Sequence, residues 1–402
     1  MAVALTLLEV GLRILAPRYG YAAASPYAES PSRLWSARPN TCQWRLAPDT
    51  GVGHLVIHNS LGLRQHREMT RAKPSGVVRI GVLGDSYTDN LRLPAYASFT
   101  EPLDYLLNRA GARVEVLNLG VDGYDADQIY VTFREECDAL DLDLVVYALC
   151  HNDLRYLDSD RLVHVDASGT VTLVDRPRSR RWTRPLRGLY LTYLAMDVLG
   201  RAESGPGSRP TTRAGGPIAR DFAAGVASPE AERAVTALLA LILDMDRQAR
   251  GRGRSFHVAT LPINGEWRLD LPLRERGISV IPLTDAFAEA FPDRSFLFRS
   301  DPHWNAAANR LAAELLFLAL AEDVGIERVD RDFASDELDE YYAAFMTGSE
   351  QGSSTSEGLA FPDRLAATRA TYLELEDGLG WCRPDDPSAS RSECPARAVE
   401  AR

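Results

Sequence analysis

The sequence predicts an α/β fold in which a parallel sheet of about five strands carries helices on both faces. Two observations lead to this prediction. Short apolar runs rich in β-branched residues alternate with longer segments whose apolar residues recur at helical spacing. Polar residues also follow directly after several of the apolar runs, and open α/β sheets bind their ligands at that edge.

The expected strands are short apolar runs that read as buried on both faces. They are 77–83, 113–119, 142–149, 255–261 and 277–283. The expected helices between and after them are 97–110, 126–139, 229–250 and 306–320. Polar and apolar residues alternate on either side of Asp166 and Gly169, which predicts a hairpin within 161–174.

The first expected strand ends at Gly84, which is followed by Asp85 and Ser86. A strand, a tight turn and a helix expose a serine hydroxyl beside backbone N–H groups, so Ser86 is a candidate nucleophile. In a different interpretation, Asp85 and Ser86 only cap the helix, because both residue types are preferred caps.

Three further stretches bring polar residues to the same side of the predicted fold. Gly123 follows the second strand, Asn152 and Asp153 follow the third, and Asp301 and His303 precede the last helix. With Ser86 they could supply a nucleophile, oxyanion donors, a base and a carboxylate that orients the base. Each also has a structural interpretation, as a turn pair after a strand or as a helix cap.

At these four blocks, the chain resembles the SGNH hydrolases, also called the GDSL esterase/lipase family, over roughly residues 59–320. The resemblance implies a three-layer α/β/α, flavodoxin-like fold and no metal or cofactor. It implies that Ser86 is the nucleophile, His303 the general base and Asp301 its carboxylate partner. The implied oxyanion donors are the backbone N–H groups of Ser86 and Gly123 and the side-chain amide of Asn152.

Two positions depart from the family pattern. Cys150 stands where a glycine is usual, two residues before Asn152. Asp301 lies two residues before His303 instead of three, and Ser300 occupies the usual position. Asp85 and Asp153 are expected to contact the site residues and hold them in place, without a catalytic role.

The resemblance divides the chain into a main domain with appendages, as its 402 residues also suggest. Residues 1–16 are expected to form a truncated membrane anchor or an amphipathic helix. The other expected segments are an extended lead-in over 17–58, a catalytic domain over 59–325 with an insertion at about 155–228, and an acidic, partly disordered extension over 326–402.

The composition of the chain argues against several kinds of binding partner. The formal net charge of −11 argues against nucleic acid and against electrostatic docking on anionic lipid. His54, His58 and His66 cluster in sequence, but no carboxylate or thiol completes a metal site, so they are expected on the surface or in hydrogen bonds.

The compartment is predicted to be extracytoplasmic, periplasmic or at the cell surface, with the cytoplasm as the alternative. Residues 2–16 are apolar except for Glu9 and Arg13, and this run alone is too short to cross a bilayer. Similar family members carry an N-terminal anchor with such a pattern. Cys382 and Cys394 lie in a polar, proline-rich stretch, where a local disulfide would suit an oxidising compartment.

The expected activity is that of a serine esterase that removes a small O-acyl group from a carbohydrate or metabolite. One alternative is an O-acyltransferase that uses the same residues, and another is a non-catalytic binding module on a hydrolase fold. The Asp-x-His-Trp block at 301–304 resembles a block of bacterial polysaccharide acetyltransferases. In those proteins the Asp/His pair precedes the serine in the sequence. Here it follows Ser86, and this order favours hydrolysis. The sequence leaves the acyl chain, the alcohol and the oligomeric state open.

Overall fold

The computed structural model describes residues 2–15, 26–50, 53–65, 67–155, 157, 160–174, 191, 228–262, 269–293 and 295–346. Most of the predicted insertion, His66, Cys382 and Cys394 lie outside the described residues.

Five parallel strands form the central sheet, in the order β11-β10-β7-β5-β6. They are β5 (Val78–Leu83), β6 (Val114–Asn118), β7 (Leu144–Leu149), β10 (Ser255–Thr260) and β11 (Ser279–Pro282). The chain starts at β5, adds β6 on one side and then crosses to the other side. β5 and β7 therefore flank the switch point where flavodoxin-like sheets bind their ligands, and the predicted sheet is confirmed.

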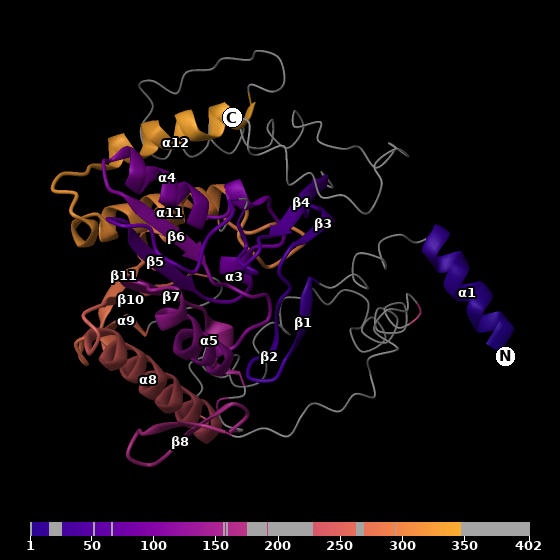
Figure 1. The fold of residues 1–402 in the computed structure, drawn as a ribbon, viewed down its shortest axis with the longest axis horizontal. Coiled ribbons are helices and arrows are strands. Elements are labelled where there is room, and N and C mark those ends of the chain that lie inside the picture. The colour runs from indigo at the N-terminus through magenta and orange to yellow at the C-terminus, as the bar shows by residue number, and fades with distance from the viewer. Residues whose placement is uncertain are drawn as a thin grey trace.

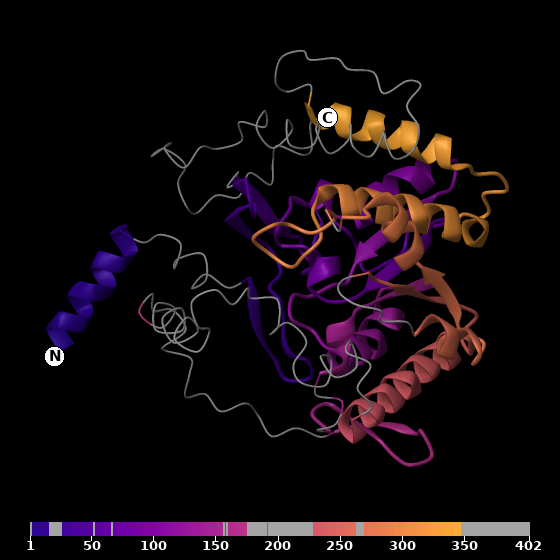
Figure 2. The same cartoon turned by 180° about the vertical axis from the view of Figure 1, so that it is seen from behind.

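Helices cover both faces of the sheet (Figure 1, Figure 2). One face carries α4 (Thr100–Arg109), α11 (Ala306–Leu320) and α12 (Arg331–Met346). The other face carries α5 (Ala126–Ala139) and α8 (Pro229–Arg250). The predicted three-layer α/β/α architecture is therefore confirmed.

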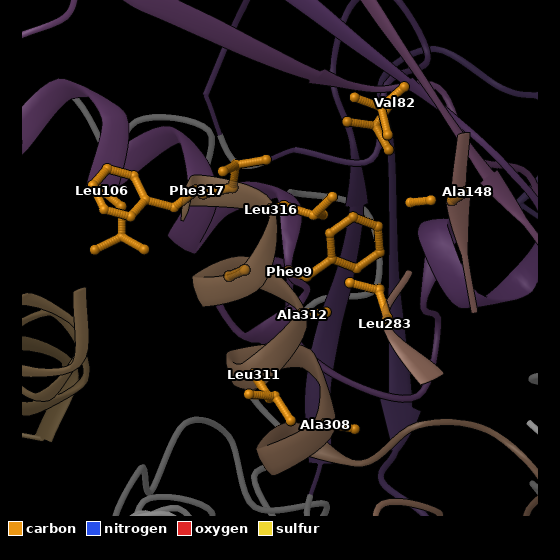
Figure 3. Packing of buried hydrophobic residues seen from close by; sticks show 14 of the residues in the cluster. Val82, Phe99, Leu106, Ala148, Leu283, Ala308, Leu311, Ala312, Leu316 and Phe317 are labelled. Carbon is orange, nitrogen blue, oxygen red and sulfur yellow. The ribbon is translucent and has the colours of Figure 1, made fainter. Parts of the chain in front are cut away.

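Strand periodicity explains why the sheet has two cores. Successive side chains of a strand point to opposite faces. In β7, Val146 and Ala148 belong to the core on the α11 side, whereas Val145 and Tyr147 belong to the core on the α8 side. Figure 3 shows the first of these cores, in which Phe99 lies between α11 and the sheet.

Shorter elements connect these layers. They are α1 (Ala2–Leu15), α3 (Ser86–Asp89), η1 (Ala95–Ala97), η2 (His151–Leu154), α9 (Asp270–Arg274), α10 (Thr284–Ala290) and η5 (Glu322–Val324). The predicted hairpin is present as β8 (Val163–Val165) paired antiparallel with β9 (Val171–Leu173).

The described part of 17–58 is not an extended lead-in but two antiparallel hairpins. β1 (Tyr27–Ser30) pairs with β2 (Leu34–Ala37), and β3 (Thr41–Leu46) pairs with β4 (Gly53–His58). The strands of the first hairpin are only four residues long and lack an apolar alternation, so the sequence pattern did not indicate them. Contacts of Trp35 and Arg33 with the main domain hold the first hairpin in place.

The ends of the chain are only partly described. Within the described residues, no helix combines the length and the apolar character that crossing a membrane requires. In the C-terminal extension, residues 331–346 form α12, which packs on α4 and α11. Its acidic residues are partly paired, since Arg109 of α4 donates to Glu337 at 2.7 Å.

Candidate active site

The turn after β5 places a serine at the start of a helix. A Cβ on Gly84 would lie 2.2 Å from Thr88 Oγ1, so the turn needs a glycine. Asp85 caps α3 by accepting a hydrogen bond from Tyr87 N at 2.9 Å, and Ser86 is the first helical residue. The capping interpretation therefore holds for Asp85, while Ser86 remains at the carboxyl edge of the sheet.

The structure brings Ser86, His303 and Asp301 together, although Ser86 and His303 are 217 positions apart in the sequence. Ser86 Oγ and His303 Nε2 lie 2.8 Å apart, and His303 Nδ1 contacts Asp301 Oδ1. A serine, the far nitrogen of an imidazole and a carboxylate on its near nitrogen form the arrangement that activates a hydroxyl nucleophile.

The short spacing between Asp301 and His303 has a local explanation. Asp301 Oδ1 also accepts a hydrogen bond from the backbone N–H of His303 at 3.0 Å. An aspartate that binds the N–H two residues later closes a compact turn, here over Pro302. One carboxylate oxygen thus reaches both the backbone and the ring of His303, so a two-residue spacing suffices.

Arg92 is the charged residue that holds Asp301 from the other side. Its Nε lies 3.6 Å from Asp301 Oδ2, and its Nη1 donates to Asp122 Oδ2 at 3.0 Å. Burial favours a raised pKa for Asp301, but the hydrogen bond from His303 and the charge of Arg92 outweigh it and lower the pKa to about 2. The carboxylate is therefore ionised at neutral pH.

Aromatic contacts fix the ring of His303. The ring of Tyr87 lies 5.0 Å from it between centroids, and the Tyr87 hydroxyl donates to Pro302 O at 2.6 Å. The next residue, Trp304, donates from Nε1 to Pro262 O at 3.0 Å. These contacts restrain the backbone on both sides of His303 as well as one face of its ring.

Asn152 reaches the same turn from the end of β7. Its Nδ2 donates to Asp85 Oδ2 at 2.7 Å. Among the described residues, Asp85 is the acceptor of this amide group, so the second amide hydrogen is available to a bound oxygen. Asp153 supports the segment by accepting from the backbone N–H of Cys150 at 2.8 Å.

Cys150, which replaces the usual glycine, is fully buried in the core that also contains Tyr87 and Trp304. Burial raises the pKa of its thiol well above the usual range, because the thiolate would be poorly solvated. The thiol is therefore neutral at physiological pH and is a poor nucleophile.

In the loop after β6, the backbone N–H of Gly123 differs from its neighbours. Gly123 has a φ of +81°, in the left-handed region that favours glycine. Within the described part of the chain, its N–H donates no hydrogen bond. The N–H groups around it are all engaged, those of Leu119, Gly120, Val121, Asp122 and Tyr124. The N–H of Gly123 is therefore available to a ligand at this edge of the sheet.

The absence of a side chain at Gly120 lets this loop approach α3, the helix of Ser86, closely. A Cβ at this position would lie 2.5 Å from Asp89 N and 2.6 Å from Thr88 Cβ. Gly120→Ala is expected to lower the free energy of unfolding by about 1–3 kcal/mol, because packed atoms must move apart. Urea denaturation would measure this, with Gly11→Ala as control, since a Cβ on Gly11 meets no atom within 4 Å. Equal stabilities of the two variants would contradict the close approach.

Arg92→Met is expected to raise the pKa of Asp301 above about 2, because the carboxylate loses a neighbouring positive charge. Titration of the Asp301 carboxyl carbon by NMR would measure it. Arg109→Met is the matched control, since Arg109 pairs with Glu337 on the surface. An unchanged pKa in Arg92→Met would exclude an electrostatic role for Arg92.

A second grouping of serine, histidine and aspartate differs from the first in its local structure. His257 Nδ1 lies 2.8 Å from Ser279 Oγ, and its Nε2 lies 3.3 Å from Asp323. Ser279 lies inside the parallel ladder, opposite His257, and not at a turn into a helix. The N–H groups that a helix start would offer to an oxyanion are therefore not provided there.

No pattern in the sequence indicates a role for Tyr87, Arg92 or Asp122. These residues act on the site through contacts between segments that are distant in the chain, and no local pattern indicates such contacts. His58 was expected on the surface or in a hydrogen bond. It is buried, with Nδ1 3.2 Å from Thr41 Oγ1 and Nε2 3.5 Å from Asp89. In the described ranges, no group of three His, Cys, Asp or Glu side chains is placed to hold a metal.

Comparisons with known proteins give fold similarity only. No family model and no curated protein matches the chain. A solved structure described as a lipolytic protein of the G-D-S-L family from Desulfitobacterium hafniense matches with 14% identity and a TM-score of 0.34. That match covers 60% of this chain and 99% of the other.

Two other structures match at a similar level. An acetylxylan esterase from Geobacillus stearothermophilus has 13% identity and a TM-score of 0.37, over 65% of this chain and all of the other. A lipase/acylhydrolase from Enterococcus faecalis has 11% identity and a TM-score of 0.34, over 63% of this chain and all of the other. The chain thus matches structures of GDSL-type lipolytic proteins and acetylxylan esterases at low sequence identity.

Proposed function

We propose that this protein is a serine esterase that works through an acyl-serine intermediate. The observation that carries the proposal is the 2.8 Å contact between Ser86 Oγ and His303 Nε2, with Asp301 bound to the other ring nitrogen. The neutral-pH charge state of Asp301 supports it as well, because an ionised carboxylate stabilises an imidazolium.

In the first step, Ser86 Oγ attacks the ester carbonyl while His303 Nε2 takes its proton. Asp301 stabilises the positive ring that results. The N–H groups of Ser86 and Gly123 and the amide of Asn152 donate to the oxyanion, and one such donor is typically worth about 2.7–4 kcal/mol. His303 then protonates the departing alkoxide.

In the second step, water replaces the alcohol, and His303 takes its proton as it attacks the acyl-serine. The ester bond to Ser86 breaks, and the serine hydroxyl regains a proton from His303. Nothing in this cycle consumes a cofactor or a redox equivalent.

The substrate we propose carries a small acyl group on a carbohydrate or metabolite. Ser86 is only 5% exposed and Asn152 only 7%, so little space is open directly around the nucleophile. A short acyl chain fits this geometry better than a long one. The intact contact between serine and histidine supports catalysis over a pure binding role.

The test is hydrolysis of p-nitrophenyl acetate, butyrate and octanoate by purified protein, together with labelling by a fluorophosphonate and peptide mapping. We expect the acetate to react fastest and the label to reside on Ser86. Folded protein that neither hydrolyses any ester nor takes the label would contradict the proposal. Labelling of Ser86 with acyl transfer to an added sugar, and without hydrolysis, would identify an O-acyltransferase instead.

A further inference from the structure

The peptide between Asp122 and Gly123 carries the proposed oxyanion donor, the N–H of Gly123, and its carbonyl group accepts a hydrogen bond on the opposite side. Trp35, from the first lead-in hairpin, donates from Nε1 to Asp122 O at 3.3 Å. This peptide is trans, so its C=O and N–H point in opposite directions. A hydrogen bond that fixes the carbonyl therefore also fixes where the Gly123 N–H points.

Trp35 is itself anchored to the segment that it holds. The hydroxyl of Tyr124 donates to Trp35 O at 2.6 Å, and the two rings meet edge to face with centroids 5.8 Å apart. Trp35 Cζ2 lies 3.6 Å from the place that a Cβ on Gly123 would occupy. Gln128 of α5 donates to Arg33 O at 2.8 Å, which docks the same hairpin.

The other polar groups of Asp122 are held as well. Its N–H donates to Asp89 Oδ2 at 2.8 Å, and its carboxylate accepts from Arg92. Asp89 belongs to the helix of the nucleophile, and Arg92 also faces Asp301. The residue before Gly123 is thus tied to the nucleophile helix, to the carboxylate of the triad and to the lead-in hairpin.

Close packing alone does not hold this loop against the hairpin. A cavity of about 220 Å³ lies between them, with Ser36 and Ala37 on the hairpin side and Asn118 to Val121 on the loop side. A segment that borders a cavity lacks neighbours on that side. The hydrogen bonds that join the hairpin to the loop are made beyond this cavity, at Asp122 and Tyr124.

We propose that Trp35 is a positioning residue that directs the Gly123 N–H toward the oxyanion. This inference rests on the proposed esterase function. It adds the first hairpin, β1 and β2, to the parts of the chain that shape the active site. A hydrogen bond to the carbonyl of a peptide also polarises that peptide, which strengthens its N–H as a donor. Trp35 touches no reacting atom in this scheme and acts only through the peptide.

The test is Trp35→Phe, which removes the donor and keeps an aromatic ring beside Tyr124, with Ser36→Ala in the same strand as the matched control. We expect kcat for p-nitrophenyl acetate to fall about ten- to a hundred-fold, less than for loss of a whole donor, with KM nearly unchanged. Affinity for a trifluoromethyl ketone, which forms a tetrahedral adduct, should fall by a similar factor. The pH dependence of kcat/KM should stay as in the wild type, because the triad is intact.

Each outcome separates this inference from the proposed function. Wild-type protein without esterase activity and without label on Ser86 would remove the proposed function and, with it, the inference. An active wild type with an equally active, folded Trp35→Phe variant would overturn only the role of Trp35. A Trp35→Phe variant with raised KM or a shifted pH profile would also overturn it, since a general disturbance of the site would then explain the loss.

Discussion

Ser86→Ala is expected to lower kcat for p-nitrophenyl acetate by on the order of 10⁶-fold, because a triad loses nearly all its function when its nucleophile is removed. In the proposed mechanism, Ser86 is the only triad member that forms a bond to the acyl group, and its hydroxyl lies 2.8 Å from Nε2 of His303, the proposed base. Steady-state rates with high enzyme concentration would measure the residual activity, and fluorophosphonate labelling should disappear in the variant.

Ser279→Ala is the matched control for this experiment. Ser279 also contacts a histidine at 2.8 Å, and that histidine also lies near a carboxylate. Its activity is expected to remain within about twofold of the wild type, because substitutions away from the reacting atoms leave transition-state contacts in place. If Ser279→Ala lost the activity and Ser86→Ala kept it, the nucleophile would lie in the other grouping.

The sequence predicted those parts of the protein that local patterns encode. The five strands followed from short β-branched runs, and the turn at Gly84 and Ser86 followed from the residues at the end of one of them. The predicted topology placed His303 on the same side of the fold as Ser86, and the resemblance to a family then paired them as base and nucleophile. No local pattern relates these two residues, which are 217 positions apart.

The contacts of Arg92 and Trp35 that support the site could not be predicted from the sequence, for the same physical reason. Arg92 has no pattern around it, yet it lies between Asp122 and Asp301. The hairpin of Trp35 has strands of four residues, and its position depends on hydrogen bonds to a loop almost ninety residues later. Such contacts depend on tertiary packing, which overrides local propensity.

Asp301→Asn is expected to lower kcat by about 10⁴-fold while leaving the fold intact. The amide has no charge to stabilise the His303 imidazolium. It can also donate to Nδ1 and thereby place the ring proton on Nε2, where the base needs a lone pair. Asp49→Asn is the matched control, because Asp49 accepts a hydrogen bond from Ser300 N at 2.7 Å and supports the same loop without contacting His303. Its kcat should change less than tenfold, and equal losses in both variants would point to loop disorder instead of lost charge.

The same pair of proteins tests the charge of Asp301 through stability. The carboxylate has a pKa of about 2 in the folded protein, against about 3.9 in an unfolded chain. A lowered pKa means that the ionised group stabilises the native state above about pH 4, and this contribution is lost as the pH falls through about 2. Urea denaturation between pH 5 and pH 2 should therefore show a steeper loss of unfolding free energy for the wild type than for Asp301→Asn. Parallel curves would mean that Asp301 is not held ionised by His303 and Arg92, and would remove the electrostatic basis of its proposed role.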